Sequence, residues 1–128
     1  FSKYFANHPD FIMQKEIGSS SWFGFSLIIR PESKLKRADI IKLLEANNIE
    51  YRPIATGDFT QNEVIKYFDY EIHGELKNAK YLQENGFFVG NHQVDISKQI
   101  ELFNKVMGGG SVAKPLTIAI YTSLQKAA

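Results

Sequence analysis

The stretch WFGFSLII, residues 22–29, carries the strongest strand signal in the chain. It is rich in aromatic and β-branched residues, which favour strands over helices. The turn residues Gly18 to Ser21 precede it and Pro31 follows it, so its length fits a single strand. The stretch therefore predicts a strand in the centre of a sheet, with the other elements packed around it.

Shorter segments on both sides supply the remaining predicted elements. Extended segments are expected at residues 11–17, 49–52, 70–73 and 87–90. Pro53 either ends regular ladder pairing after the second of these or places that strand at a sheet edge. Apolar residues recur at helical spacing over 35–48, 63–68, 76–85 and 95–107. Short strands mixed with helices predict an α+β fold with two layers, in which helices cover one face of a small mixed or antiparallel sheet.

Local signals predict where these helices begin and end. Ser33 and Asp95 are expected to cap the first and the last helix. Thr60 and Glu63 have the spacing of a capping box, in which each side chain bonds the other residue's amide. Gly86 is expected in the left-handed conformation that ends many helices.

Composition bounds the class of protein. The chain has 128 residues, a formal net charge of +1 and no cysteine, so we expect one domain without disulfides or thiolate metal sites. The balanced charge predicts no nucleic-acid partner, and no apolar run is long enough to predict a membrane span. A cytoplasmic protein is expected.

The chain divides at a glycine run. Residues 108–111, Gly-Gly-Gly-Ser, have the composition of a flexible linker, which predicts a domain over 1–107 and a separate tail over 108–128. Within the tail, 116–121 fits a strand or the first strand of a neighbouring domain. The chain begins with Phe1 instead of Met, and we expect it to be a piece of a longer protein.

The residues alone reveal little catalytic chemistry. The three histidines lack ligand-spaced partners, which predicts no metal site, and no phosphate loop or nucleophile elbow is present. Residues 19–21 and 22–25 fit a turn and a core better than a catalytic serine or a base-stacking platform, and His73 and His92 fit structural roles. What remains is one polar loop, RPIATGDFTQNE, residues 52–63, which could be a strand, turn and helix start or a ligand-binding loop.

Several segments together resemble a known family. They are SSSWFGFSLIIRPES, residues 19–33, and the run from LLEANNIEYRP to HQVDISKQIELF, residues 43–103. In order and spacing they resemble the C-terminal small domain of the DegT/DnrJ/StrS-type enzymes, which use pyridoxal phosphate on nucleotide-linked keto sugars. The branch they are most similar to contains the hexulose dehydrases of lipopolysaccharide sugar synthesis.

The resemblance implies a larger enzyme. Family members are usually homodimers, and a large domain holds pyridoxal phosphate through a lysine, or has a histidine at that place in the dehydrase branch. The small domain closes over the active site and helps to hold the nucleotide sugar. No lysine of this chain matches the cofactor-binding segment. We therefore expect that the isolated chain binds no cofactor, contributes no catalytic residue and has no activity of its own.

The resemblance also implies substrate-binding residues. Arg52 matches an arginine of the family that follows a short strand, and Gly57, Asp58 and Thr60 match a Gly-Asn-Phe/Leu-Thr loop near the substrate. Asp58 replaces the expected asparagine, and a carboxylate cannot donate a hydrogen bond to phosphate as an amide can. Gln61 stands where the family often has a basic residue. His92 follows a Gly-Asn pair that also matches and could face the large domain.

Two other functions stay open at this point. The chain could be a non-catalytic binding or interaction module derived from the family, because the catalytic half is missing and two loop residues depart from the pattern. The tail could also begin a second catalytic domain of a fused enzyme. The residue at the cofactor-lysine position, which lies outside this sequence, would separate aminotransfer from dehydration.

Overall fold

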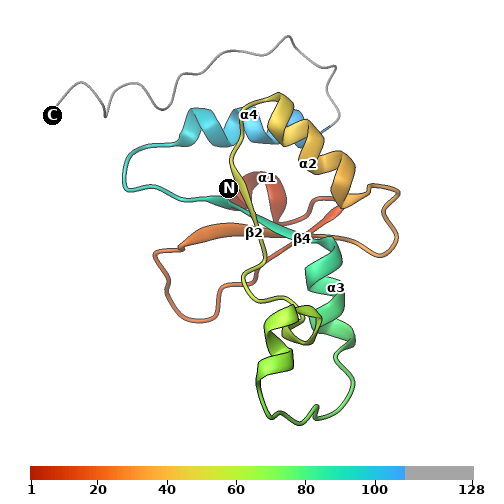
Figure 1. Ribbon diagram of the computed structural model, residues 1–128. Helices are drawn as coiled ribbons and strands as arrows, with labels where there is room; N and C mark the ends of the chain where they lie inside the picture. The colour runs from red at the N-terminus through yellow and green to blue at the C-terminus, as the bar shows by residue number, and fades with distance from the viewer. Residues whose placement is uncertain (109–128) are drawn as a thin grey trace, which may run out of the picture.

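The predicted central strand is β2, Gly24–Ile29, and it lies inside a four-stranded antiparallel sheet (Figure 1). The computed structural model describes residues 1–108. The strand order is β1-β2-β4-β3, so β2 and β4 are the inner strands. The other strands are β1, Phe11–Met13, β3, Tyr51–Pro53, and β4, Gly86–Gly90. The α+β prediction is confirmed, the predicted edge strand is β3, and all pairings are antiparallel.

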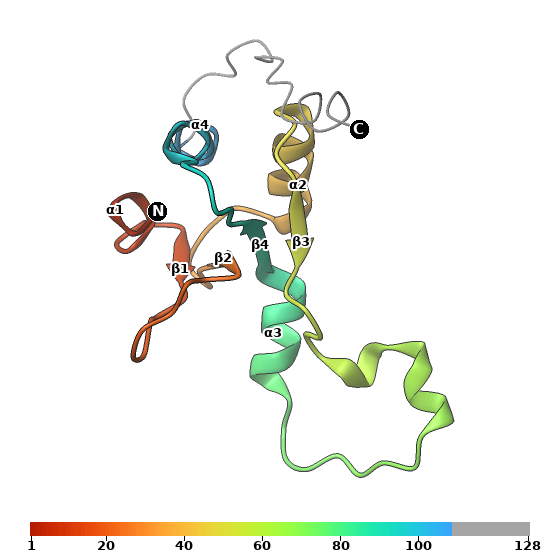
Figure 2. The same cartoon turned by 90° about the vertical axis from the view of Figure 1, so that its left-hand side faces the viewer.

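Helices lie on both sides of the sheet. The helices α1, Ser2–Phe5, α2, Arg37–Ala46, and α4, Ser97–Met107, cover one face and form the predicted helical layer (Figure 2). The helix α3, Lys77–Asn85, lies below the sheet in both views and leads directly into β4. Two short 3-10 helices, η1, Phe59–Gln61, and η2, Glu63–Tyr67, precede α3.

The core forms where alternate strand residues meet α1, α2 and α4. Phe87 of β4 and Leu27 of β2 pair across the ladder, and both are fully buried. The ring of Phe87 meets that of Phe11 edge to face at a centroid distance of 6.1 Å. Each fully buried side chain of this size stabilises the fold by about 2 kcal/mol. The helical layer adds Phe5, Ile40, Leu44, Phe103 and Met107.

The opposite face of the sheet has no such cover over β1 and β2. Phe88 projects from this face, because its neighbours Phe87 and Val89 point into the core. Ile12 and Phe23 are exposed on the same side, and Phe23 is 90% exposed. Gly24 has no side chain here, and a Cβ would lie 2.7 Å from the Phe88 ring, so glycine lets that ring lie across the strand.

Several predicted boundaries were wrong. The first strand ends at Met13 instead of residue 17, and the central strand starts at Gly24, because Trp22 has a φ of 51° that no strand accommodates. Residues 70–73 form no strand, and 63–67 is a 3-10 helix with no buried residue. The glycine-rich linker and tail prediction falls on residues of which only Gly108 is described.

The predicted caps also need correction. Thr60 and Glu63 form no capping box, because Asp58 caps η1 and Asn62 caps η2. Ser33 accepts from the Leu35 amide two residues ahead of α2 and does not cap the helix itself. Gly86 has a φ of −102°, which is extended and not left-handed, because the chain passes from α3 into β4 without a turn.

Candidate functional site

Arg52 lies on the edge strand β3 and points to the uncovered face of the sheet. It is paired in register with Phe88, and side chains of directly opposite residues share a face. Its Nη2 lies 2.6 Å from Oε1 of Glu50, and both side chains are about two-thirds exposed. An exposed ion pair of this kind contributes at most about 1 kcal/mol, so an incoming anion can displace Glu50.

Asp58 has the opposite environment, because it is 4% exposed and is the buried polar side chain of the described region. Its Oδ1 accepts hydrogen bonds from the amide of Thr60 at 3.1 Å and from the Thr60 hydroxyl at 2.6 Å. These bonds start η1, since an aspartate at this position satisfies an amide that has no partner in the helix. The carboxylate is therefore occupied by local structure and is turned away from solvent.

A second contact fixes the loop to α3. The amide nitrogen of Asp58 donates to Oε1 of Gln83 at 2.8 Å, across 25 residues of sequence. Gly57 has a φ of +50°, and a Cβ there would lie 2.8 Å from the same Oε1. Glycine is required by both the conformation and the close approach. Sequence reasoning missed Gln83, because no local pattern distinguishes it from other polar residues of α3.

Thr60 and Gln61 complete the loop, and only Gln61 is open to solvent. The Thr60 hydroxyl is committed to Asp58. The amide of Gln61 bonds the Asp58 carbonyl at 3.0 Å, which leaves its side chain projecting from the surface. Of the predicted substrate-binding residues in this segment, Arg52 and Gln61 are the ones accessible to a ligand.

His92 is held apart from this loop. It follows the C-terminal end of β4, whereas Gln83 and the Gly57 loop lie beside the N-terminal end of that strand. The exposed His92 ring accepts through Nδ1 from the Val94 amide at 3.3 Å. His92 and the Gly57 loop therefore lie near opposite ends of β4, and the predicted site residues do not form a single cluster.

Asn91, the residue before His92, has a clear structural role. From the sequence it was noted only as part of the Gly-Asn pair that matches the family. Its Nδ2 donates to the carbonyls of Trp22 at 2.8 Å and Ser21 at 3.1 Å. These bonds join the loop after β4 to the loop before β2, where Trp22 has its positive φ. Asn91 thus stabilises the turn that positions the aromatic side chains of the uncovered face.

Two grooves flank the edge strand. One, of about 540 Å³, lies between the end of α2 and β3, and Tyr51 donates from its hydroxyl to Glu45 at 3.1 Å across it. Burial first and this hydrogen bond second raise the pKa of Tyr51 above its ordinary value. The other, of about 360 Å³, lies on the uncovered face, and its walls include Trp22, Phe23 and Phe88. Neither groove gathers basic side chains, since Arg52 is the one basic residue in the two linings and is paired with Glu50.

His8 is a structural histidine at the start of β1. Its ring stacks on Phe5 and tilts against Phe11, and its Nδ1 accepts from the Asp10 amide at 3.1 Å. Burial lowers the pKa of His8, with a smaller opposing effect of Asp10 and a further lowering by Arg30. The lowered pKa favours the neutral ring in the folded chain.

The described residues hold no cluster of metal ligands, and their lysines lie on the surface. Within residues 1–108, no group of three or more histidine or acidic side chains could hold a metal ion. Every lysine of that range is exposed, and no lysine lines either groove. No helix among these residues is long and apolar enough to cross a membrane.

Comparison with known proteins identifies clear relatives. The chain is 51% identical over 106 residues to a GDP-4-keto-6-deoxy-D-mannose 3-dehydratase of Yersinia pseudotuberculosis, and 45% identical over 108 residues to one of Escherichia coli. These alignments cover 81% and 84% of the chain but 27% and 28% of the relatives. No protein-family model matches the chain.

Solved structures of such dehydratases share the fold. A GDP-4-keto-6-deoxymannose-3-dehydratase (ColD) variant with bound GDP-perosamine matches with a TM-score of 0.79 and 44% identity over 83% of the chain and 28% of that protein. The E. coli enzyme with bound hydrated pyridoxal phosphate matches equally well, at 45% identity over 82% of the chain and 27% of that protein. The chain is thus similar in sequence and fold to about a quarter of the GDP-4-keto-6-deoxymannose 3-dehydratases, which hold pyridoxal phosphate.

Proposed function

We propose that the chain is the C-terminal small domain of a pyridoxal-phosphate enzyme that removes the 3-hydroxyl of a nucleotide-linked 4-keto-6-deoxy sugar. The observation that carries the proposal is the 51% identity to a dehydratase of this specificity along most of the chain. Identity at that level supports a shared fold and a shared general role of the domain. A GDP-linked sugar is the substrate class that the names of both dehydratases favour.

The role of the domain is to complete the substrate site, and the catalytic groups belong to the rest of the enzyme. Arg52 can pair with a phosphate once Glu50 is displaced, because a guanidinium can bind two oxygens at once. Gln61 offers a neutral amide that can donate to a sugar hydroxyl or a phosphate. Gly57, Asp58 and Thr60 act indirectly, since their bonds to Gln83 and to each other set where Gln61 projects. His92 has no assigned contact with substrate.

The experiment is to produce the full-length protein that contains this chain. Pyridoxal phosphate is measured by mass spectrometry of the native protein. The sugar product is then identified after incubation with a GDP-linked 4-keto-6-deoxy sugar. We expect bound cofactor and a product that has lost one water. Bound cofactor with an amino-sugar product would replace dehydration by aminotransfer, and a full-length protein without any cofactor-binding region would refute the proposal.

Arg52→Gln separates a substrate role from a structural one. The side chain is exposed, so the variant should fold as the wild type does. Loss of one charge-assisted contact to a phosphate should raise KM about tenfold or more. Lys80→Gln removes an equally exposed cation of α3, 3.9 Å from Glu84 and outside this loop, and serves as the control with unchanged KM.

A further inference from the structure

Residues 54–76 form an arm that projects away from the sheet on the side opposite α2 and α4 (Figures 1 and 2). The arm contains η1 and η2, neither of which has a buried residue. It carries most of the large apolar side chains that are exposed in the described part of the chain. They are Phe59, Val64, Tyr67, Phe68, Tyr70, Ile72 and Leu76, with exposures from 36% to 86%.

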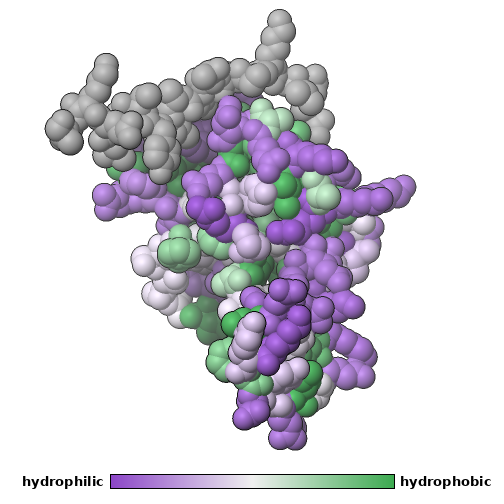
Figure 3. Space-filling model, in the orientation of Figure 1, coloured by the Kyte–Doolittle hydropathy of each residue, from purple (hydrophilic) through white to green (hydrophobic). Residues whose placement is uncertain are grey.

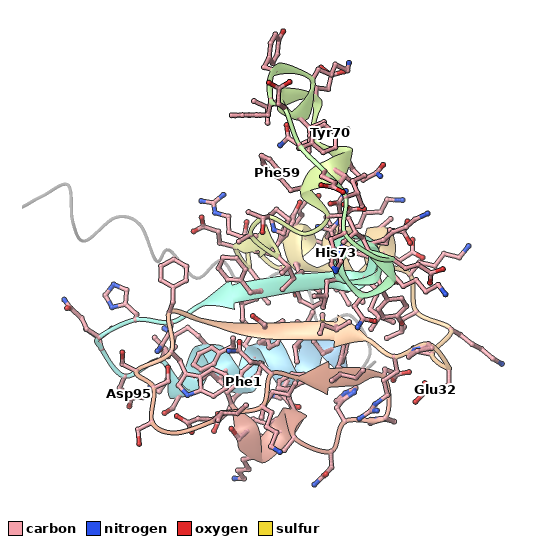
Figure 4. The ribbon with its side chains drawn as sticks, turned by 90° about the horizontal axis from the view of Figure 1, so that it is seen from below. Phe1, Glu32, Phe59, Tyr70, His73 and Asp95 are labelled. Carbon is pink, nitrogen blue, oxygen red and sulfur yellow. The ribbon has the colours of Figure 1, made fainter. Side chains whose placement is uncertain are left out.

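The base of the arm is fixed. Asp58 and Gly57 join it to Gln83 of α3, and the Asn62 side chain accepts from the Val64 amide at 3.0 Å to start η2. The apolar side chains therefore stand on a segment with defined hydrogen bonds. In Figure 4, Phe59 and Tyr70 lie along the arm and far from Phe1, which packs in the helical layer on the other side of the sheet.

The charge of the arm disfavours anionic ligands on the part beyond its base at Gln61. Residues 54–76 contain five acidic residues and one lysine. The lysine, Lys66, is already paired with Glu63, and Glu75 is paired with Lys77 outside the arm. A diphosphate or a nucleic acid would meet net negative charge here. On the lower part of Figure 3, hydrophobic residues in green lie beside hydrophilic residues in purple. The mixture of exposed apolar and acidic side chains instead suits an apolar protein surface with a basic rim.

The exposed apolar area is large enough to form an interface. Seven half-exposed side chains of this size present on the order of 500 Å² to solvent, which exceeds scattered surface apolarity and approaches the roughly 800 Å² that one partner contributes to a standard interface. The relatives supply a candidate for the covering surface. Nearly three quarters of the Yersinia dehydratase lies outside the part that matches this chain.

We propose that the arm, residues 54–76, docks on the large cofactor-binding region of the same polypeptide. This rests on the proposed function, which supplies that region. Tyr67, Phe68 and Tyr70 are the anchors, because they are the most exposed aromatic side chains of the arm. The contact also fixes the Gly57 loop and Gln61, which belong to the base of the arm. The apolar part of the arm beyond Gln61, residues 62–76, therefore positions Gln61 against the large region and does not bind the sugar itself.

The test is amide hydrogen exchange of residues 59–72 in the 128-residue chain and in the full-length protein. Docking predicts exchange at least about tenfold slower in the full-length protein, because docked amides open only with the interface. Equal rates in the two proteins would overturn the proposal. Slow exchange that appears in the 128-residue chain alone and grows with its concentration would also overturn it, in favour of a second copy as the partner.

A variant set distinguishes docking from folding. Tyr67→Ser, Phe68→Ser and Tyr70→Ser combined should leave the melting temperature of the 128-residue chain unchanged, since these side chains are exposed in it. In the full-length protein the same changes should abolish the slow exchange. Ile17→Ser, at a side chain that is 90% exposed outside the arm, is the control and should leave it intact. If exchange stays slow in the triple variant, Tyr67, Phe68 and Tyr70 are not the side chains that hold the arm on the large region.

The outcome is separable from that of the proposed function. Cofactor content is measured on the same full-length samples. Bound cofactor without slow exchange of 59–72 would refute docking alone. Slow exchange without bound cofactor would retain docking and refute the proposed function.

Discussion

The amide nitrogen of Asp58 lies 2.8 Å from Oε1 of Gln83, and this one hydrogen bond joins the loop after β3 to the helix before β4. Asp58 lies in the loop after β3, Gln83 lies in α3, which leads into β4, and the two strands pair with each other. The bond therefore joins the two ends of the long connection between these strands. The position of Gln61 and of the whole arm depends on it. The first prediction concerns this bond.

Gln83→Met should lower the free energy of unfolding by about 1–2 kcal/mol, because a partly buried amide loses its acceptor while the side-chain volume is kept. Urea denaturation of the 128-residue chain measures this. Glu84→Met, at the neighbouring exposed residue whose carboxylate lies 3.9 Å from Lys80, is the control and should change the value by less than about 0.5 kcal/mol. Equal effects of the two changes would mean that the Gln83 bond contributes nothing.

Gly57→Ala should destabilise the chain more than Gly74→Ala. Both glycines have positive φ, +50° and +73°, so each substitution costs about 1 kcal/mol for the backbone. At Gly57 the new methyl group also meets Gln83 within 2.9 Å, whereas nothing lies within 4 Å at Gly74. We expect a further loss of at least about 1 kcal/mol at Gly57 by thermal denaturation. Equal losses would show that the loop can move away from α3 at no cost.

Asn91→Asp should destabilise the chain by about 1–2 kcal/mol, because a carboxylate cannot donate to the carbonyls of Ser21 and Trp22. Asn62→Asp provides a matched control. The Asn62 side chain only accepts, from the Val64 amide, so aspartate there should be neutral or slightly stabilising at the start of η2. The same chemical change is thus expected to have different effects at two positions. Loss of stability at both would point to added negative charge as the cause.

The stability of the chain should fall as the pH is lowered through the ordinary histidine range. The folded state lowers the pKa of His8 below its ordinary value of 6.5, so the unfolded chain binds the proton more readily. The stabilisation is complete above about pH 6.5 and is lost below it. His8→Asn keeps an acceptor for the Asp10 amide and removes the titration. Melting curves from pH 7.5 to 5 should fall less steeply for the variant, and parallel curves would exclude His8 as the cause.

The fold was predictable where a local pattern and burial coincide. Residues 22–29 and 87–90 became the inner strands, because apolar runs between turn signals have few other solutions. The arm was not predictable, since Val64, Ile65 and Phe68 follow a helical period and yet contact no core of the described structure. Apolar residues at helical spacing indicate that one face of the segment is apolar. They do not indicate which surface covers that face.

For the candidate site, the sequence predicted the loop but not the contacts that shape it. Arg52 was proposed from its match to an arginine of the family, and the structure shows it exposed on an edge strand, where a ligand can reach it. Asp58 was expected near a ligand, but it is a buried cap, because an Asx turn and a binding loop share the same short sequence. The Gln83 bond to the Asp58 amide spans 25 residues, and the Asn91 bonds to the loop before β2 span about 70. No local sequence pattern encodes contacts over such separations.

The most direct measurement is calorimetric titration of a GDP-linked sugar into the 128-residue chain and, in parallel, into the full-length protein. If the chain is a small domain that completes a site formed elsewhere, heat of binding should appear only with the full-length protein, and Arg52→Gln should weaken it. Tight binding by the 128-residue chain alone would contradict this and would identify the chain as an independent binding module.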